Sequence, residues 1–234
     1  MDEETKTLLL WLIPTGMLVF FLFRIFLCSS IGLKPYVTKH PAKDKNIERT
    51  KDTGAWAERN GFELLDFYVV RYGMLQFFMA TWESIEKPVY LCQYSFGTGS
   101  GTVDFTSIFD NEIELTTVNS KDANAYPKPL WDYHQSFSKC GFNELYQMHI
   151  EGEEYLITKG WAKRAKLPID FEQCFLNSMK KQKCYGRKHW YRIFFILYFY
   201  FFRRYKWHNK TIQQQHERGM IQLPNEIHPE QLYR

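Results

Sequence analysis

The chain alternates between long apolar runs and short polar breaks, and the first apolar run lies near the amino terminus. Residues 8–27 contain sixteen apolar side chains out of twenty, and only a Pro-Thr-Gly step and Arg24 interrupt them. A helix of this length rises about 30 Å, which matches the hydrocarbon core of a bilayer. The pattern therefore predicts a transmembrane anchor within residues 1–33.

A cleaved signal peptide and a buried core helix are the alternatives for this run. A signal peptide begins with basic residues and ends at a small-residue cleavage site. This chain instead begins with acidic residues at positions 2–4, and bulky residues precede the nearest small ones. A retained anchor is therefore the favoured interpretation.

The basic residues that flank the run predict its orientation. One lysine precedes it, and seven lysine or arginine residues follow between Arg24 and Lys51. Because basic flanks stay on the cytoplasmic side, we expect the amino terminus outside and residues 34–188 in the cytoplasm. The predicted location is a membrane, either a bacterial inner membrane or an organellar one.

Residues 34–46 form a predicted basic linker, and residues 47–160 have the pattern of a compact domain. Polar and apolar side chains alternate with period two in residues 102–109, which is typical of a strand. Helical spacing appears in residues 47–60 and 142–159. The predicted strands are 62–71, 74–82, 89–96, 102–109 and 112–118.

These elements predict an α+β fold. It has a small antiparallel sheet of about five strands with one or two helices packed on it. A transmembrane helix precedes this domain, a basic aromatic membrane-associated region follows it at residues 161–208, and residues 209–234 form a polar tail.

Several short motifs in the domain resemble a group of uncharacterised bacterial proteins that carry an amino-terminal membrane anchor. This resemblance covers residues 55–160 at most and implies a bacterial source but no activity. The motifs are Ala55-Trp56-Ala57-Glu58 with Gly61-Phe62, Leu115-Thr116-Thr117, Gln135-Ser136-Phe137, and Glu144-Leu145-Tyr146 with His149.

Composition adds a strong charge asymmetry. The chain has 234 residues, of which 18% are aromatic and 24% charged, so a disordered chain and a disulfide-dense miniprotein are excluded. The net charge of +4 is small, but residues 52–158 carry 16 acidic and 6 basic groups. Residues 159–210 carry 14 basic and 2 acidic groups. An acidic domain is therefore followed by a basic segment.

The basic segment contains an aromatic stretch. Eleven of the nineteen residues in 189–207 are aromatic, and basic clusters flank the stretch on both sides. A segment lying on or re-entering the cytoplasmic leaflet, a second transmembrane helix and a buried core element are the three interpretations. Translocating a basic cluster is unfavourable, so the first is preferred, with anionic headgroups as partners. The predicted membrane-contacting residues are Trp11, Arg24, Trp190, Arg192, Arg203, Arg204 and Trp207.

Basic and aromatic residues together also occur on nucleic-acid surfaces. Such surfaces interleave aromatic with polar residues, whereas residues 193–202 contain no polar group outside their tyrosine hydroxyls. No nucleic-acid partner is therefore expected.

Four residues form the one candidate chemical constellation, and each has an ordinary structural interpretation as well. Cys140 precedes the predicted helix 142–159, whose amino-terminal dipole favours a thiolate. Either His134 or His149 could act as its base, with Asp132 nearby. The spacing matches no common zinc pattern, and no cofactor or metal is expected. The favoured interpretation is structural for all four, so no catalytic residue is assigned.

The leading functional expectation is a non-enzymatic interaction module, an accessory subunit or scaffold of a membrane protein complex. One alternative is a membrane-surface hydrolase or acyltransferase that uses Cys140 with a nearby histidine. The other is a ligand-sensing or lipid-handling module, which requires a concave apolar pocket.

Overall fold

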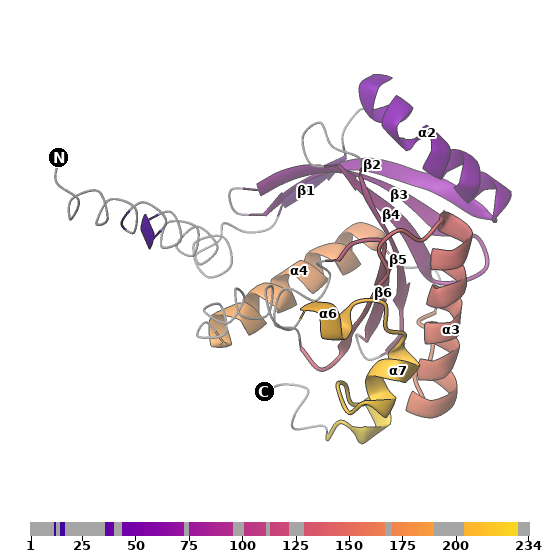
Figure 1. Ribbon diagram of the computed structural model, residues 1–234. Coiled ribbons are helices and arrows are strands. Elements are labelled where there is room, and N and C mark those ends of the chain that lie inside the picture. Colours follow the sequence, from indigo (N-terminus) through magenta and orange to yellow (C-terminus); the bar gives the residue numbers. More distant parts are fainter. Residues whose placement is uncertain are drawn as a thin grey trace, which may run out of the picture.

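The computed structural model describes one α+β unit built on a single sheet with helices on both of its faces (Figure 1). The described residues are 12, 15–16, 36–39, 44–72, 75–95, 101–110, 113–121, 129–166, 170–189 and 204–228.

Seven strands form the sheet, and their spatial order equals their order in the chain. Successive neighbours are antiparallel up to the sixth strand, and the last pair is parallel, so the sheet is mixed. The strands are β1 (Tyr36–Lys39), β2 (Phe62–Tyr72), β3 (Leu75–Ser84), β4 (Val89–Ser95), β5 (Thr102–Ile108), β6 (Glu114–Val118) and β7 (Asp132–Ser136).

Helices α2 and α3 cover one face of the sheet, and α4 crosses the opposite face (Figure 1). Asp170 caps α4 by accepting a hydrogen bond from the backbone N–H of Gln173, as the first turn of a helix requires. The described helices are α2 (Asp44–Arg59), α3 (Phe142–Gly160), α4 (Phe171–Lys188), α6 (Arg204–Trp207), α7 (Ile212–Glu217) and the 3₁₀ turn η4 (Pro224–Glu226).

The central strands are buried on both faces because helices cover both. In β4, Leu91 joins the core beneath α2 and α3, while Tyr90 and Cys92 join the core beneath α4. Phe105 of β5 packs against Trp56 of α2, with ring centroids 5.5 Å apart. Strands β2, β3 and β4 each supply apolar side chains to both of these cores, as expected for a sheet between two helical layers.

A buried glutamine connects the sheet to two helices, α3 and α7. The Gln135 amide of β7 donates to the Thr117 hydroxyl and to the Met148 carbonyl, at 2.9 and 3.0 Å. Its carbonyl oxygen accepts from the Ile212 backbone N–H at 2.8 Å. A Cβ atom at Gly152 of α3 would lie 2.6 Å from the Gln135 amide nitrogen. Glycine at this position therefore lets α3 approach the glutamine.

The carboxyl-terminal elements pack on α3 and β7. Gln215 of α7 donates to the His134 backbone carbonyl at 2.8 Å. His216 lies between the Tyr155 hydroxyl of α3, at 2.9 Å, and the Glu226 carboxylate, at 3.0 Å. These contacts hold residues 211–227 against the domain.

The predicted fold class is wrong in two respects. The sheet has seven strands rather than about five and is mixed rather than antiparallel. The additional strands are β1, whose short Tyr-Val-Thr-Lys sequence lies in the predicted linker, and β7, in which only Tyr133 is a large apolar residue. Strand β7 is buried through hydrogen-bonded polar side chains, so hydrophobic alternation could not reveal it.

The predicted transmembrane anchor is also corrected. Of residues 8–27, only Leu12, Thr15 and Gly16 belong to the described part of the chain. Among the described residues, no helix has both the length and the apolar content required to cross a bilayer. The assignments of a single-pass membrane protein, a membrane location and a cytoplasmic-facing domain do not stand. The prediction rested on the apolar count of a run that a Pro-Thr-Gly step and Arg24 interrupt, and no described helix reproduces that run.

Candidate functional site

A cavity of about 330 Å³ lies between α4 and the sheet. Strands β3 to β7 form its floor and α4 forms its roof. The lining residues are Phe77, Tyr90, Cys92, Tyr94, Asp104, Thr106, Ile108, Glu114, Thr116, Asp132, His134, Phe171, Cys174, Phe175, Ser178, Met179 and Gln182. The lining therefore combines aromatic walls with a small number of polar groups, as ligand pockets do.

Strand alternation and register place the polar groups together on the floor. Tyr90, Thr106, Thr116 and His134 lie on four neighbouring strands and form one row across the sheet. The hydroxyls of Thr106 and Thr116 are 3.2 Å apart, within hydrogen-bonding distance. Successive residues of a strand point to opposite faces, so all four side chains face α4.

Three carboxylates face the cavity from β5, β6 and β7. Glu114 and Asp132 are direct neighbours across the parallel strand pair, and Asp104 lies on the adjoining strand. Two polar side chains of α4 bond to them: the Ser178 hydroxyl donates to Glu114 at 2.8 Å, and the Gln182 amide approaches Asp132 at 3.4 Å. No lysine or arginine is found among the described residues that line the cavity.

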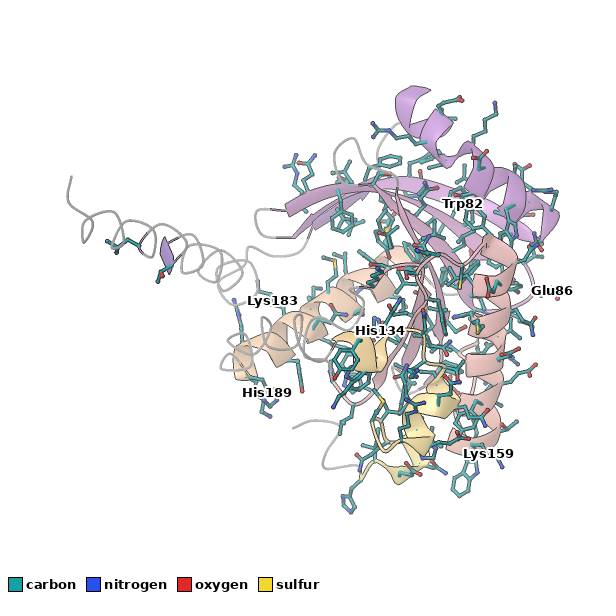
Figure 2. All side chains as sticks on the ribbon, in the orientation of Figure 1. Trp82, Glu86, His134, Lys159, Lys183 and His189 are labelled. Atoms are coloured by element: carbon teal, nitrogen blue, oxygen red, sulfur yellow. The ribbon has the colours of Figure 1, made fainter. Side chains whose placement is uncertain are left out.

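Asp132 and His134 form a close pair within the cavity. Figure 2 labels the position of His134. The Asp132 Oδ1 and His134 Nε2 atoms are 2.6 Å apart. The Asp132 side chain is 1% exposed and that of His134 is 14% exposed. Because the carboxylate is buried and fixed, it orients the imidazole ring toward one tautomer.

The tyrosine and cysteine side chains of the cavity are held in their neutral forms. Burial, reinforced by the nearby Asp104 carboxylate, raises the pKa of Tyr94 and of the Cys92 thiol well above their ordinary values. Burial also raises the pKa of Cys174. Thiols with raised pKa values are poor nucleophiles, so the cavity cysteines act as apolar lining.

His149 lies on the opposite face of the sheet from the cavity. Its Nε2 is 2.8 Å from the Ser107 hydroxyl, and its Nδ1 is 2.9 Å from the Thr117 hydroxyl. Complete burial lowers its pKa from 6.5 to about 3. Both ring nitrogens are therefore engaged, and His149 is a neutral structural residue of the α3 core.

Cys140 lies just before α3, as predicted, but its environment does not produce a thiolate. Burial, together with the neighbouring Glu144 carboxylate, raises the pKa of the Cys140 thiol. Its contacts are with the aromatic core beneath α2 and α3, whereas His134 faces α4. The structure thus brings together Asp132 and His134 from the predicted constellation and separates both from Cys140 and His149.

Most of the predicted membrane-contacting residues lie outside the described part of the chain. These are Trp11, Arg24, Trp190, Arg192 and Arg203. Arg204 and Trp207 belong to the short helix α6, and the Trp207 side chain is partly buried.

No group of three or more His, Cys, Asp or Glu side chains in the described ranges is placed to hold a metal ion. Sequence reasoning did not identify Asp104, Glu114 or Thr116 as site residues. Alternation within 102–109 indicated which side chains share a face. The helix that covers this face was not predicted, so nothing in the sequence indicated the cavity.

Comparisons with protein-family models, with curated proteins and with solved structures gave no match to this chain.

Proposed function

We propose that this chain is a binding module for a small organic cation with an apolar body, which occupies the cavity between α4 and the sheet. One observation supports this proposal above all others: three carboxylates and five aromatic side chains line the same cavity. Carboxylates attract a cation through charge, and the electron-rich faces of aromatic rings add to that attraction.

The volume of the cavity limits the size of the ligand. A water molecule in the liquid occupies about 30 Å³, so a cavity of 330 Å³ corresponds to roughly eleven water molecules. Known ligand pockets begin at about 300 Å³. A ligand on the order of ten to fifteen non-hydrogen atoms is therefore the expected occupant, for example one aromatic ring and an ammonium group.

This proposal develops one of the three functions expected from the sequence. A ligand-sensing module required a concave apolar pocket, and the cavity supplies one. The scaffold or accessory-subunit function was expected partly because of the predicted membrane anchors. The enzyme that uses Cys140 required a histidine beside an activated thiol. The raised pKa of Cys140 and the engaged nitrogens of His149 favour the binding module over that enzyme.

A pair of matched probes tests the proposal. Phenacyltrimethylammonium and 3,3-dimethyl-1-phenylbutan-1-one have the same shape and thirteen non-hydrogen atoms each, but only the first is charged. We expect isothermal titration calorimetry to show at least about tenfold tighter binding of the cation, equal to about 1.4 kcal/mol. Equal affinities for the two probes would refute the requirement for a cationic ligand. If neither probe binds, the proposal is overturned.

Conservative variants connect the affinity to the cavity. Glu114→Gln keeps an acceptor for Ser178 but removes a charge, so it should weaken cation binding and leave binding of the neutral probe nearly unchanged. Asp104→Asn should behave in the same way. Glu144→Gln on the exposed surface of α3 is the matched control and should bind both probes as the unmodified chain does.

A further inference from the structure

The three carboxylates of the cavity differ in how well a ligand can reach them. Asp104 and Asp132 are buried, at 8% and 7% exposure, whereas Glu114 is partly exposed. The Ser178 hydroxyl of α4 donates to Oε2 of Glu114 at 2.8 Å. Because a carboxylate accepts about four hydrogen bonds, Glu114 can keep this bond and also accept from a ligand. Glu114 is therefore the carboxylate that a ligand contacts directly.

Two partly exposed hydroxyls extend the polar floor beside Glu114. Thr116 follows Glu114 by two residues on β6, so both side chains face the same side of the sheet. Its hydroxyl is 3.2 Å from that of Thr106, and both threonines are partly exposed. A hydroxyl has one proton and two lone pairs, and one proton of this pair is used between the two oxygens. The floor next to Glu114 therefore offers more hydrogen-bond acceptors than donors.

An aromatic surface lies close to this floor on α4. Phe175 precedes Ser178 by three residues, so its side chain lies on the same side of the helix, about 4.5 Å away along the axis. Phe175 is partly exposed, and its ring stacks on that of Phe171 with centroids 5.7 Å apart. A linker of two or three carbon atoms spans the separation between this ring and the carboxylate that Ser178 contacts.

We propose that the ligand is a primary amine joined to an aromatic ring by two or three carbon atoms. Its ammonium group donates hydrogen bonds to Glu114 and to the hydroxyl pair of Thr106 and Thr116, and its ring lies against Phe175. The inference rests on the proposed function, because it names the class of cation that occupies that same cavity.

The separation of the acceptors from the aromatic surface favours an ammonium that carries N–H groups. An aromatic cage surrounds a quaternary ammonium with ring faces, whereas here the acceptors lie on the sheet and Phe175 lies on α4. Hydrogen bonds from a cation to a carboxylate are about twice as strong as those between neutral groups. A primary ammonium therefore gains more from this floor than a quaternary nitrogen of equal charge.

Two cations with the same body test this requirement by isothermal titration calorimetry. The first is 3-phenylpropylammonium, and the second is its N,N,N-trimethyl counterpart, which has the same charge but no N–H group. We expect the full chain to bind the primary amine at least about tenfold more tightly. Equal affinities, or tighter binding of the quaternary cation, would overturn the inference.

A nearly isosteric variant connects this selectivity to the floor. Thr116→Val removes one hydroxyl and keeps the shape of the side chain, so it should weaken binding of the primary amine several-fold and leave the quaternary cation nearly unaffected. Thr158→Val, at an exposed position on α3, is the matched control and should preserve the selectivity. Circular dichroism confirms that each variant is folded. A folded Thr116→Val chain with undiminished selectivity would overturn the assignment of the hydroxyl pair to the ammonium.

A series of linkers tests the position of the ring. Phenylalkylammonium ions with one to five linker carbons should bind most tightly at two or three, where the ring reaches Phe175 while the nitrogen contacts Glu114. An affinity that rises steadily with every added carbon would show only apolar burial and would overturn this placement.

The failures of the two proposals are distinguishable. If phenacyltrimethylammonium binds but 3-phenylpropylammonium binds no more tightly than its quaternary counterpart, the amine inference is overturned and the binding function stands. If none of these cations binds, both are overturned.

Discussion

His149 makes the stability of this domain depend on pH in a direction that can be worked out from its burial. Burial lowers its pKa in the folded state to about 3, whereas an unfolded histidine keeps its ordinary value of 6.5. The unfolded chain therefore binds a proton that the folded chain excludes. Because the unfolded state binds more protons between these two values, stability falls as pH is lowered from 6.5 toward 3.

The magnitude follows from the separation of the two values. At about pH 5 the ratio of protonated to neutral histidine in the unfolded chain is roughly thirty to one, while His149 in the folded chain stays neutral. Lowering the pH from about 7 to about 5 should therefore cost about 2 kcal/mol of unfolding free energy through this one group. Carboxylates titrate mainly below this window, so they contribute little to the change.

Urea unfolding at a series of pH values, followed by tryptophan fluorescence, measures this loss. His149→Gln removes the titrating ring but keeps hydrogen-bonding capacity toward Ser107. This variant should be less stable than the unmodified chain at neutral pH and should lose about 2 kcal/mol less between pH 7 and pH 5. His228→Gln is the matched control and should reproduce the slope of the unmodified chain. Parallel stability–pH curves for the unmodified chain and His149→Gln would refute the reasoning.

Two further predictions concern the packing of α3. Gly152→Ala places a Cβ atom 2.6 Å from the Gln135 amide nitrogen, and displacing this buried amide should cost about 1–3 kcal/mol in chemical unfolding, despite the higher helix propensity of alanine. Arg164→Met leaves the fully buried Glu153 carboxylate without its two hydrogen bonds of 2.8 and 3.1 Å. The cost should be about 2–3 kcal/mol, below that of a fully buried pair since the Arg164 side chain is 37% exposed. The double variant Glu153→Gln/Arg164→Met should recover part of this loss, and a strictly additive result would contradict the coupling.

The elements with regular apolar periodicity could be predicted from the sequence. The helix expected at residues 142–159 is α3, and the five expected strands correspond to β2 through β6 within three residues at each end. Strand β7 could not be predicted because Gln135 and Ser136 are buried through hydrogen bonds rather than through apolar side chains. Local alternation of apolar and polar residues does not show which distant residues will form such hydrogen bonds.

The candidate site was only half predictable. Asp132 and His134 were named in the predicted constellation because they precede Cys140 closely in the chain, with no strand predicted to place them. Strand β7 puts both side chains on one face because they are two residues apart. Their grouping with Cys140 and His149 was wrong in space because the sheet separates its two faces. The cavity itself depends on α4 packing over the acidic face, a long-range contact that charge counts alone do not specify.

The hydrogen bond from Ile212 to Gln135 has a consequence for the order of events during synthesis. The two partners are 77 residues apart in the chain, so at about 5–20 residues per second the ribosome needs roughly 4–15 seconds to deliver the second after the first. Strand β7 can pair with β6 during this interval, but the glutamine oxygen still lacks the donor that it has in the finished fold. The contact between the carboxyl-terminal segment and β7 can therefore form only after residue 212 has been made, and a chain released earlier lacks the donor that satisfies the Gln135 oxygen.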